Sequence, residues 1–115
     1  ANLNHEGLEA VLAGNYELAV VRFREAAKHD YPAALANLGL MDLNATGVTR
    51  DGRQALALLE RAAKKGNLVA AENIARAYDF GLGVHQDRSR AIGWYTRAAS
   101  MGSTTAPAAL QRLTQ

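Results

Sequence analysis

Residues 70–102 read AAENIARAYDFGLGVHQDRSRAIGWYTRAASMG, and residues 34–66 read ALANLGLMDLNATGVTRDGRQALALLERAAKKG. A shift of 36 residues superimposes the two stretches, and the residues that coincide are mostly small or turn-forming. The coinciding pairs include Ala34 with Ala70, Asn37 with Asn73, Gly47 with Gly83, Asp51 with Asp87, Ala55 with Ala91, Ala62 with Ala98, and Gly66 with Gly102. So many matches at one offset predict an internal repeat.

Each copy has the pattern of a helix, a loop and a second helix. In the second helix of the first copy, Ala55, Leu59 and Ala62 recur at spacings of four and three, which places them on one apolar face. Asp51 is suited to cap the start of that helix, and Gly66 to end it in a left-handed conformation. The second copy repeats this arrangement, so the repeat predicts stacked antiparallel helix pairs.

The flanking segments are variants of the same unit. The N-terminal unit has a shorter loop, because Gly7 and Ala19 are 12 positions apart whereas Gly39 and Ala55 are 16 apart. The segment 104–115 repeats only a first helix and is predicted to act as a C-terminal cap. We therefore expect one domain over residues 1–115, divided into a unit at 1–30, repeats at 31–67 and 68–103, and the cap. The seven predicted helices span 3–13, 16–29, 32–44, 52–65, 68–80, 88–101 and 105–114.

The composition agrees with closely packed helices and excludes several other classes. Hydrophobic residues form 49% of the 115, but aromatic residues only 6%, a balance that favours helices over sheets. The formal net charge is +2 without any run of like charge, which makes nucleic acid a poor candidate partner. The absence of cysteine excludes disulfides and thiolate metal sites, and no apolar stretch is long enough to predict insertion into a membrane.

At the repeated residues the chain resembles the Sel1-like repeat family, a branch of the tetratricopeptide superfamily. The second copy carries most of the family pattern: Ala70, Tyr78, Gly81, Gly83-Val84, Asp87, Ala91, Trp94-Tyr95, Ala98-Ala99 and Gly102. The first copy departs from it at Asp42, where tyrosine is expected, and at Leu58-Leu59, where an aromatic pair is expected; in the second copy, Ala75 replaces a glycine. The resemblance implies an all-α solenoid and a role as an adaptor or assembly factor. It slightly favours a bacterial periplasm or cell envelope over the cytoplasm.

Tetratricopeptide proteins line a concave groove with the first helix of each pair, and the resemblance implies the same here. The expected groove residues are Leu8, Val11, Ala36, Leu40, Leu43, Glu72, Arg76, Asp79, Phe80 and Arg112. An apolar strip beside a charged strip suits an extended peptide or a partner helix. Two alternatives stay open: Leu40 and Leu43 could instead pack between helices, and the charged residues of 72–79 could form a solvated helix face.

Nothing in the sequence predicts catalysis, a cofactor or a metal site. His5, His29 and His85 lie in different units without ligand spacing, and His5-Glu6 lacks the second histidine of a zinc-protease motif. The principal hypothesis is a monomeric module that binds a protein or a peptide. The alternatives are an assembly element that self-associates or stacks with further repeats and, more distantly, a hydrolase related to Sel1-repeat enzymes.

Overall fold

The computed structural model describes residues 2–44 and 52–115. Within this part of the chain the structure has seven α-helices and no strand, which confirms the predicted all-α solenoid. The helices are α1 (Leu3–Leu12), α2 (Tyr16–Ala27), α3 (Pro32–Asn44), α4 (Gly52–Lys64), α5 (Leu68–Phe80), α6 (Arg88–Ser100) and α7 (Ala106–Thr114).

Short polar residues start the helices and glycines end several of them. The side chains of Asn2, Asn15, Asn67 and Asp87 each accept a hydrogen bond from the backbone N–H three residues later. The predicted cap at Asp51 and the predicted turn at Gly47 lie outside the described residues. The predicted stops at Gly66 and Gly102 are confirmed, because their φ angles are 90° and 101°, in the left-handed region that glycine tolerates.

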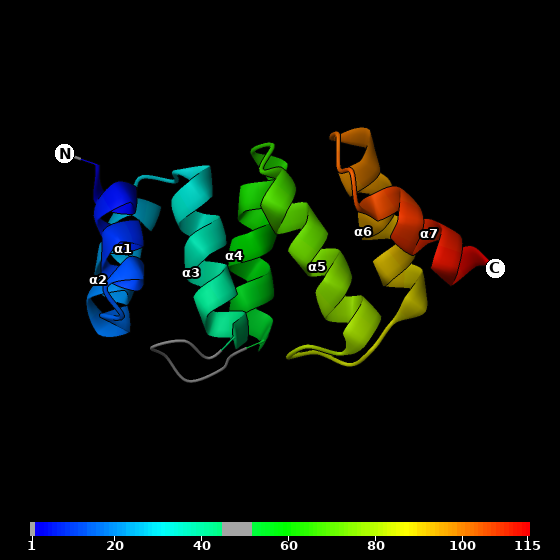
Figure 1. The fold of residues 1–115 in the computed structure, drawn as a ribbon, viewed down its shortest axis with the longest axis horizontal. Helices are drawn as coiled ribbons and strands as arrows, with labels where there is room; N and C mark the ends of the chain where they lie inside the picture. The colour runs from blue at the N-terminus through cyan, green and yellow to red at the C-terminus, as the bar shows by residue number, and fades with distance from the viewer. Residues whose placement is uncertain (1, 45–51) are drawn as a thin grey trace.

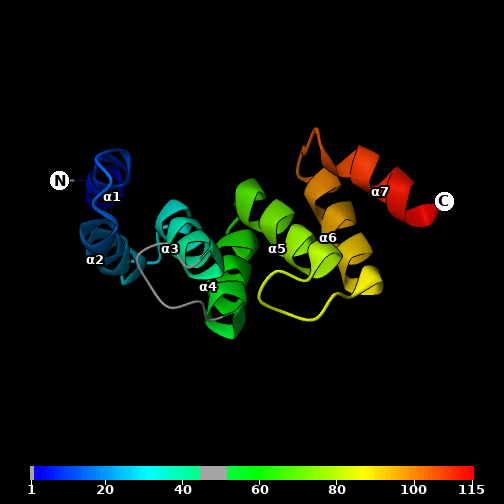
Figure 2. The same ribbon diagram turned by 60° about the horizontal axis from the view of Figure 1, so that its bottom comes forward.

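The helices form two layers along a row that measures 45 × 26 × 22 Å. Each helix packs against the helices before and after it, and the odd-numbered helices lie in front of the even-numbered ones (Figure 1). Figure 2 shows α1 and α7 higher than α3 and α5, so the layer of odd-numbered helices follows the inner side of a shallow curve. We call the side of α1, α3, α5 and α7 that points away from the other layer the inner face.

Small residues let the two layers approach closely. A Cβ atom on Gly7 would lie 2.4 Å from the ring of Phe23, and one on Gly39 would lie 2.9 Å from Leu59. Phe23 and Leu59 are almost completely buried, as are the alanines of the predicted apolar faces. The core therefore runs the length of the row between the layers, and the prediction that Leu59 belongs to it is confirmed.

Candidate functional site

The inner face is built from equivalent positions of the four odd-numbered helices. Gly7 lies against α2 as Gly39 lies against α4, so the two glycines occupy equivalent positions of their units. Steps of 36 residues from Gly39 give the equivalent positions of the later units, Ala75 and Gln111. The residue after each of these positions lies about 100° further around its helix, away from the packed layer. These four residues form a row along the inner face: Leu8, Leu40, Arg76 and Arg112.

Side chains in and beside this row remain accessible. Leu8 is 42% exposed and Leu40 is half-buried, whereas Arg76 and Arg112 are exposed. One helical turn after Arg76, Phe80 is 57% exposed. The structure adds two exposed apolar side chains that were not predicted, Leu12 and Val69. The signal that could have identified Leu12 is its register, because it is equivalent to Phe80.

A hollow lies between α5 and α7 at one end of this row. Its lining consists of Arg76, Phe80, Tyr95, Thr105, Ala108, Ala109 and Arg112. The guanidinium of Arg112 lies over the Phe80 ring, 5.6 Å from the ring centre. The hollow thus combines an exposed aromatic ring with two cationic side chains, and it brings together three of the predicted groove residues.

Tyr95 and Arg112, which line this hollow, also belong to a polar cluster around the buried Asp79. Asp79 is 3% exposed, and its Oδ2 accepts hydrogen bonds from the Tyr95 hydroxyl at 2.9 Å and from Arg112. Burial, followed by the hydrogen bond to Asp79 and its negative charge, raises the pKa of Tyr95 to about 12. The phenol therefore stays protonated at neutral pH and donates to the carboxylate, while the same carboxylate raises the pKa of Arg112.

Glu72 contacts the loop before α7. Its Oε2 accepts hydrogen bonds from the Thr105 hydroxyl at 3.0 Å and from the Ser103 hydroxyl. Ser103 in turn accepts from the backbone N–H of Ala106, the first residue of α7. Glu72 therefore fixes the start of α7 against α5.

For three residues the prediction of an exposed position in the groove is wrong. Ala36 is 2% exposed and Leu43 3%, so both lie in the core rather than on an open groove. Asp79 is buried and already bonded to Tyr95 and Arg112, so it cannot offer a free carboxylate to a partner. The reason is their position, since Leu43 and Asp79 follow Gly39 and Ala75 by four residues and point back toward the even-numbered layer. Val11, at the equivalent place in α1, is partly buried against the core.

Comparison with known proteins gives the same architecture. The model of the Sel1 repeat matches residues 32–67 and 68–103, together more than half of the chain. The chain belongs to the Sel1 repeat family. Folds of this kind commonly serve as protein-interaction modules.

Two solved structures illustrate this similarity. A Sel1 repeat protein from Oxalobacter formigenes is 30% identical, with a TM-score of 0.79 over 94% of this chain. A protective antigen from uropathogenic Escherichia coli strains, which displays an SLR fold, is 29% identical, with a TM-score of 0.81 over 90% of this chain. The Sel1-repeat chain spans 46% of the first protein and 23% of the second. A search of curated protein sequences gives no match.

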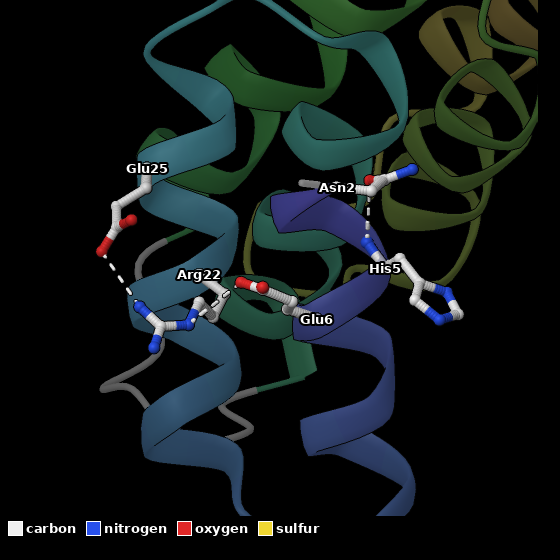
Figure 3. Close-up of polar contacts among 5 residues, drawn as sticks. All are labelled: Asn2, His5, Glu6, Arg22 and Glu25. Atoms are coloured by element: carbon white, nitrogen blue, oxygen red, sulfur yellow. Dashed lines mark hydrogen bonds and ion pairs between the residues drawn. The ribbon is translucent and has the colours of Figure 1, made fainter.

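The first helix pair of this Sel1-repeat chain carries charges where the later pairs carry apolar groups. Figure 3 shows Arg22 between two carboxylates, with N–O distances of 3.4 Å to both Glu6 and Glu25. By register, Glu6 corresponds to Leu38 and Ile74, which are buried. Arg22 likewise corresponds to the partly buried Leu58 and Trp94. The α1–α2 pair therefore carries half-exposed charges at positions that are apolar in the later pairs.

The last helix shows a similar change of chemistry. Gln111 occupies the position at which Gly39 and Ala75 meet their partner helices, and its side chain is exposed. Ala106 and Leu113 are buried, and Ala109 and Leu110 pack against the core, so α7 turns its apolar side inward. Neither end of the described row presents the close-packed apolar face that its internal pairs share.

A second hollow lies away from the inner face, between α4 and the loop before α6. It is lined by Arg53, Leu56, Ala57, Glu60, Tyr78, Gly83, Val84 and His85, none of which was predicted as a site residue. Among residues 2–44 and 52–115, no three histidine or acidic side chains are grouped to hold a metal ion. No helix in the same part of the chain has the length and apolar content required to cross a membrane.

Proposed function

We propose that this Sel1-repeat chain is a non-catalytic module that holds a peptide or a helix of a partner protein on its inner face. The observation that carries the proposal is the set of exposed apolar side chains, Leu8 and Phe80 among them, beside the arginines of the same face. Exposed apolar groups rimmed by polar ones are typical of surfaces that bind proteins. The curved layer of helices supplies the extended surface that solenoid proteins use for this purpose.

The chemistry of the inner face supports binding rather than catalysis. The carboxylates of Glu72 and Asp79 are already bonded to hydroxyl groups that hold α7 and α6 in place. Their hydrogen bonds stabilise the shape of the surface, which is the role of a polar cluster beneath a recognition site. The side chains left exposed beside them are a phenylalanine ring and guanidinium groups, and aromatic residues and arginine are enriched at protein interfaces.

The alternative of stacking with further copies is less well supported, because the first helix pair carries the ion-paired Glu6, Arg22 and Glu25, and α7 has the polar Gln111 where internal pairs pack closely. A stacked pair would bury the Glu6–Arg22–Glu25 charges, and buried ion pairs lose their hydration. We therefore expect the isolated chain to be a monomer. Light scattering at micromolar concentration should give the mass of one chain, and a stable dimer would instead favour the stacking alternative.

The binding function can be tested with paired variants of similar exposure. Leu8 and Phe80 lie on the inner face, whereas Leu18 (38% exposed) and Val21 lie on the accessible side of α2. The variant Leu8→Ala/Phe80→Ala should lose most captured partner when immobilised chain is incubated with lysate of its source cell. The control Leu18→Ala/Val21→Ala should retain it, because all four side chains are exposed and their loss should change folding stability little.

Quantitative mass spectrometry of the captured proteins measures both effects, and thermal unfolding confirms that both variants are folded. Equal loss from the two variants, or loss from the control alone, would contradict a site on the inner face.

A further inference from the structure

The row of equivalent residues on the inner face changes chemistry along its length. Its first two members, on α1 and α3, are Leu8 and Leu40, and its last two, on α5 and α7, are Arg76 and Arg112. Because the four positions are structurally equivalent, an occupant that follows the curve meets alkyl groups at one end and guanidinium groups at the other. The row therefore has a polarity that could select both the sequence and the direction of a bound segment.

The two arginines at the cationic end differ in what holds them. Arg112 is bonded to the buried Asp79 and lies over Phe80, but half of its side chain remains exposed. Arg76 is exposed and has no hydrogen bond or ion pair with any residue of 2–44 or 52–115. The residues that line the hollow between them include no acidic side chain, and the one carboxylate bonded to Arg112, that of Asp79, is buried. An anion placed there would meet the free guanidinium of Arg76, which can bind a carboxylate with two parallel hydrogen bonds, and the remaining N–H groups of Arg112.

We infer that the inner face recognises an extended acidic segment of a partner protein, with apolar side chains over α1 and α3 and carboxylates over α5 and α7. This inference rests on the proposed binding function and adds its chemistry and direction. The bound segment would then carry its large apolar residues to one side of its acidic residues, in the order in which the row presents leucines and arginines.

A selection from random dodecapeptides displayed on phage tests the inference with defined probes. On the wild-type chain, the enriched peptides should carry paired acidic residues to one side of large apolar residues. Fluorescence anisotropy of the best labelled peptide should then show about tenfold weaker binding to Arg76→Glu, because a carboxylate would face a carboxylate. The matched control is Arg24→Glu, which reverses an exposed arginine on α2 and should change binding by less than about twofold.

The outcomes separate the inference from the function on which it rests. The inference would be overturned if the enriched peptides lacked acidic residues. It would also be overturned if they bound Arg76→Glu as tightly as wild type but Leu8→Ala/Phe80→Ala more weakly. Either result would leave the inner-face site intact. Peptides insensitive to both changes would overturn the proposed function as well. Single-stranded DNA of 12 nucleotides that bound through Arg76 more tightly than the best peptide would also overturn the inference, since the site would then recognise phosphate.

Discussion

Leu43→Ala is expected to lower the free energy of unfolding by about 2–5 kcal/mol, the range for truncation of a buried leucine. Leu43 is 3% exposed and Leu59, its matched reference in α4, is fully buried, so Leu59→Ala should have a loss in the same range. Leu40 is only partly buried on the inner face, and Leu40→Ala should lower the same free energy by about 1 kcal/mol.

Denaturant unfolding of the three variants measures these differences. Leu40 and Leu43 are three residues apart, and the sequence pattern alone allowed either a groove or a core position for both. If Leu40→Ala proved as destabilising as Leu59→Ala, Leu40 would belong to the core and the row on the inner face would lose one of its two apolar members. If Leu43→Ala had little effect, the packing of α3 described above would be wrong.

Asp79→Leu is expected to lower the free energy of unfolding by about 1–3 kcal/mol, because it leaves the largely buried hydroxyl of Tyr95 without its acceptor. Tyr95 is 5% exposed, and its only hydrogen bond to a described side chain is the one to Asp79. The positions equivalent to Asp79 and Tyr95 hold an apolar pair in the other units, which is Leu43 and Leu59 in one and Val11 and Phe23 in the first. The double variant Asp79→Leu/Tyr95→Phe recreates such an apolar pair and should recover most of the loss.

A double-mutant cycle with Asp79→Leu, Tyr95→Phe and their combination tests this coupling. Replacement of a buried polar pair by apolar groups of similar size is often neutral, whereas removal of one partner alone is destabilising. Additive losses in the double variant would show that the two side chains are not coupled through the hydrogen bond. The polar cluster would then not be what fixes α6 against α5.

The repeat in the sequence was sufficient to predict the fold. Alanines and leucines at spacings of three and four, with aspartate and glycine at several helix boundaries, placed all seven helices with ends within two residues of those observed. These signals are local, because capping and the apolar face of a helix are decided within one or two turns.

The candidate site was predicted less completely, since burial depends on contacts between distant residues. Asp79 resembles a surface charge in the sequence, but its partners Tyr95 and Arg112 follow it by 16 and 33 residues. Ala36 and Leu43 were assigned to the groove because they share a helix with Leu40, although they point toward other neighbours. Which side of an odd-numbered helix points to the core is shown by the close approach of Gly7 to α2 and of Gly39 to α4. This close approach exists only in the packed structure, so the sequence pattern could not distinguish core from groove positions.

The central claim is that a partner protein occupies the inner face, and the most direct test is to locate a bound segment on the folded chain. An isotope-labelled chain titrated with the best selected dodecapeptide should show its largest amide chemical-shift changes in α1, α3, α5 and α7, around Leu8, Arg76, Phe80 and Arg112. Changes concentrated instead on the accessible side of α2 near Leu18, or in the hollow lined by Arg53 and His85, would contradict the claim.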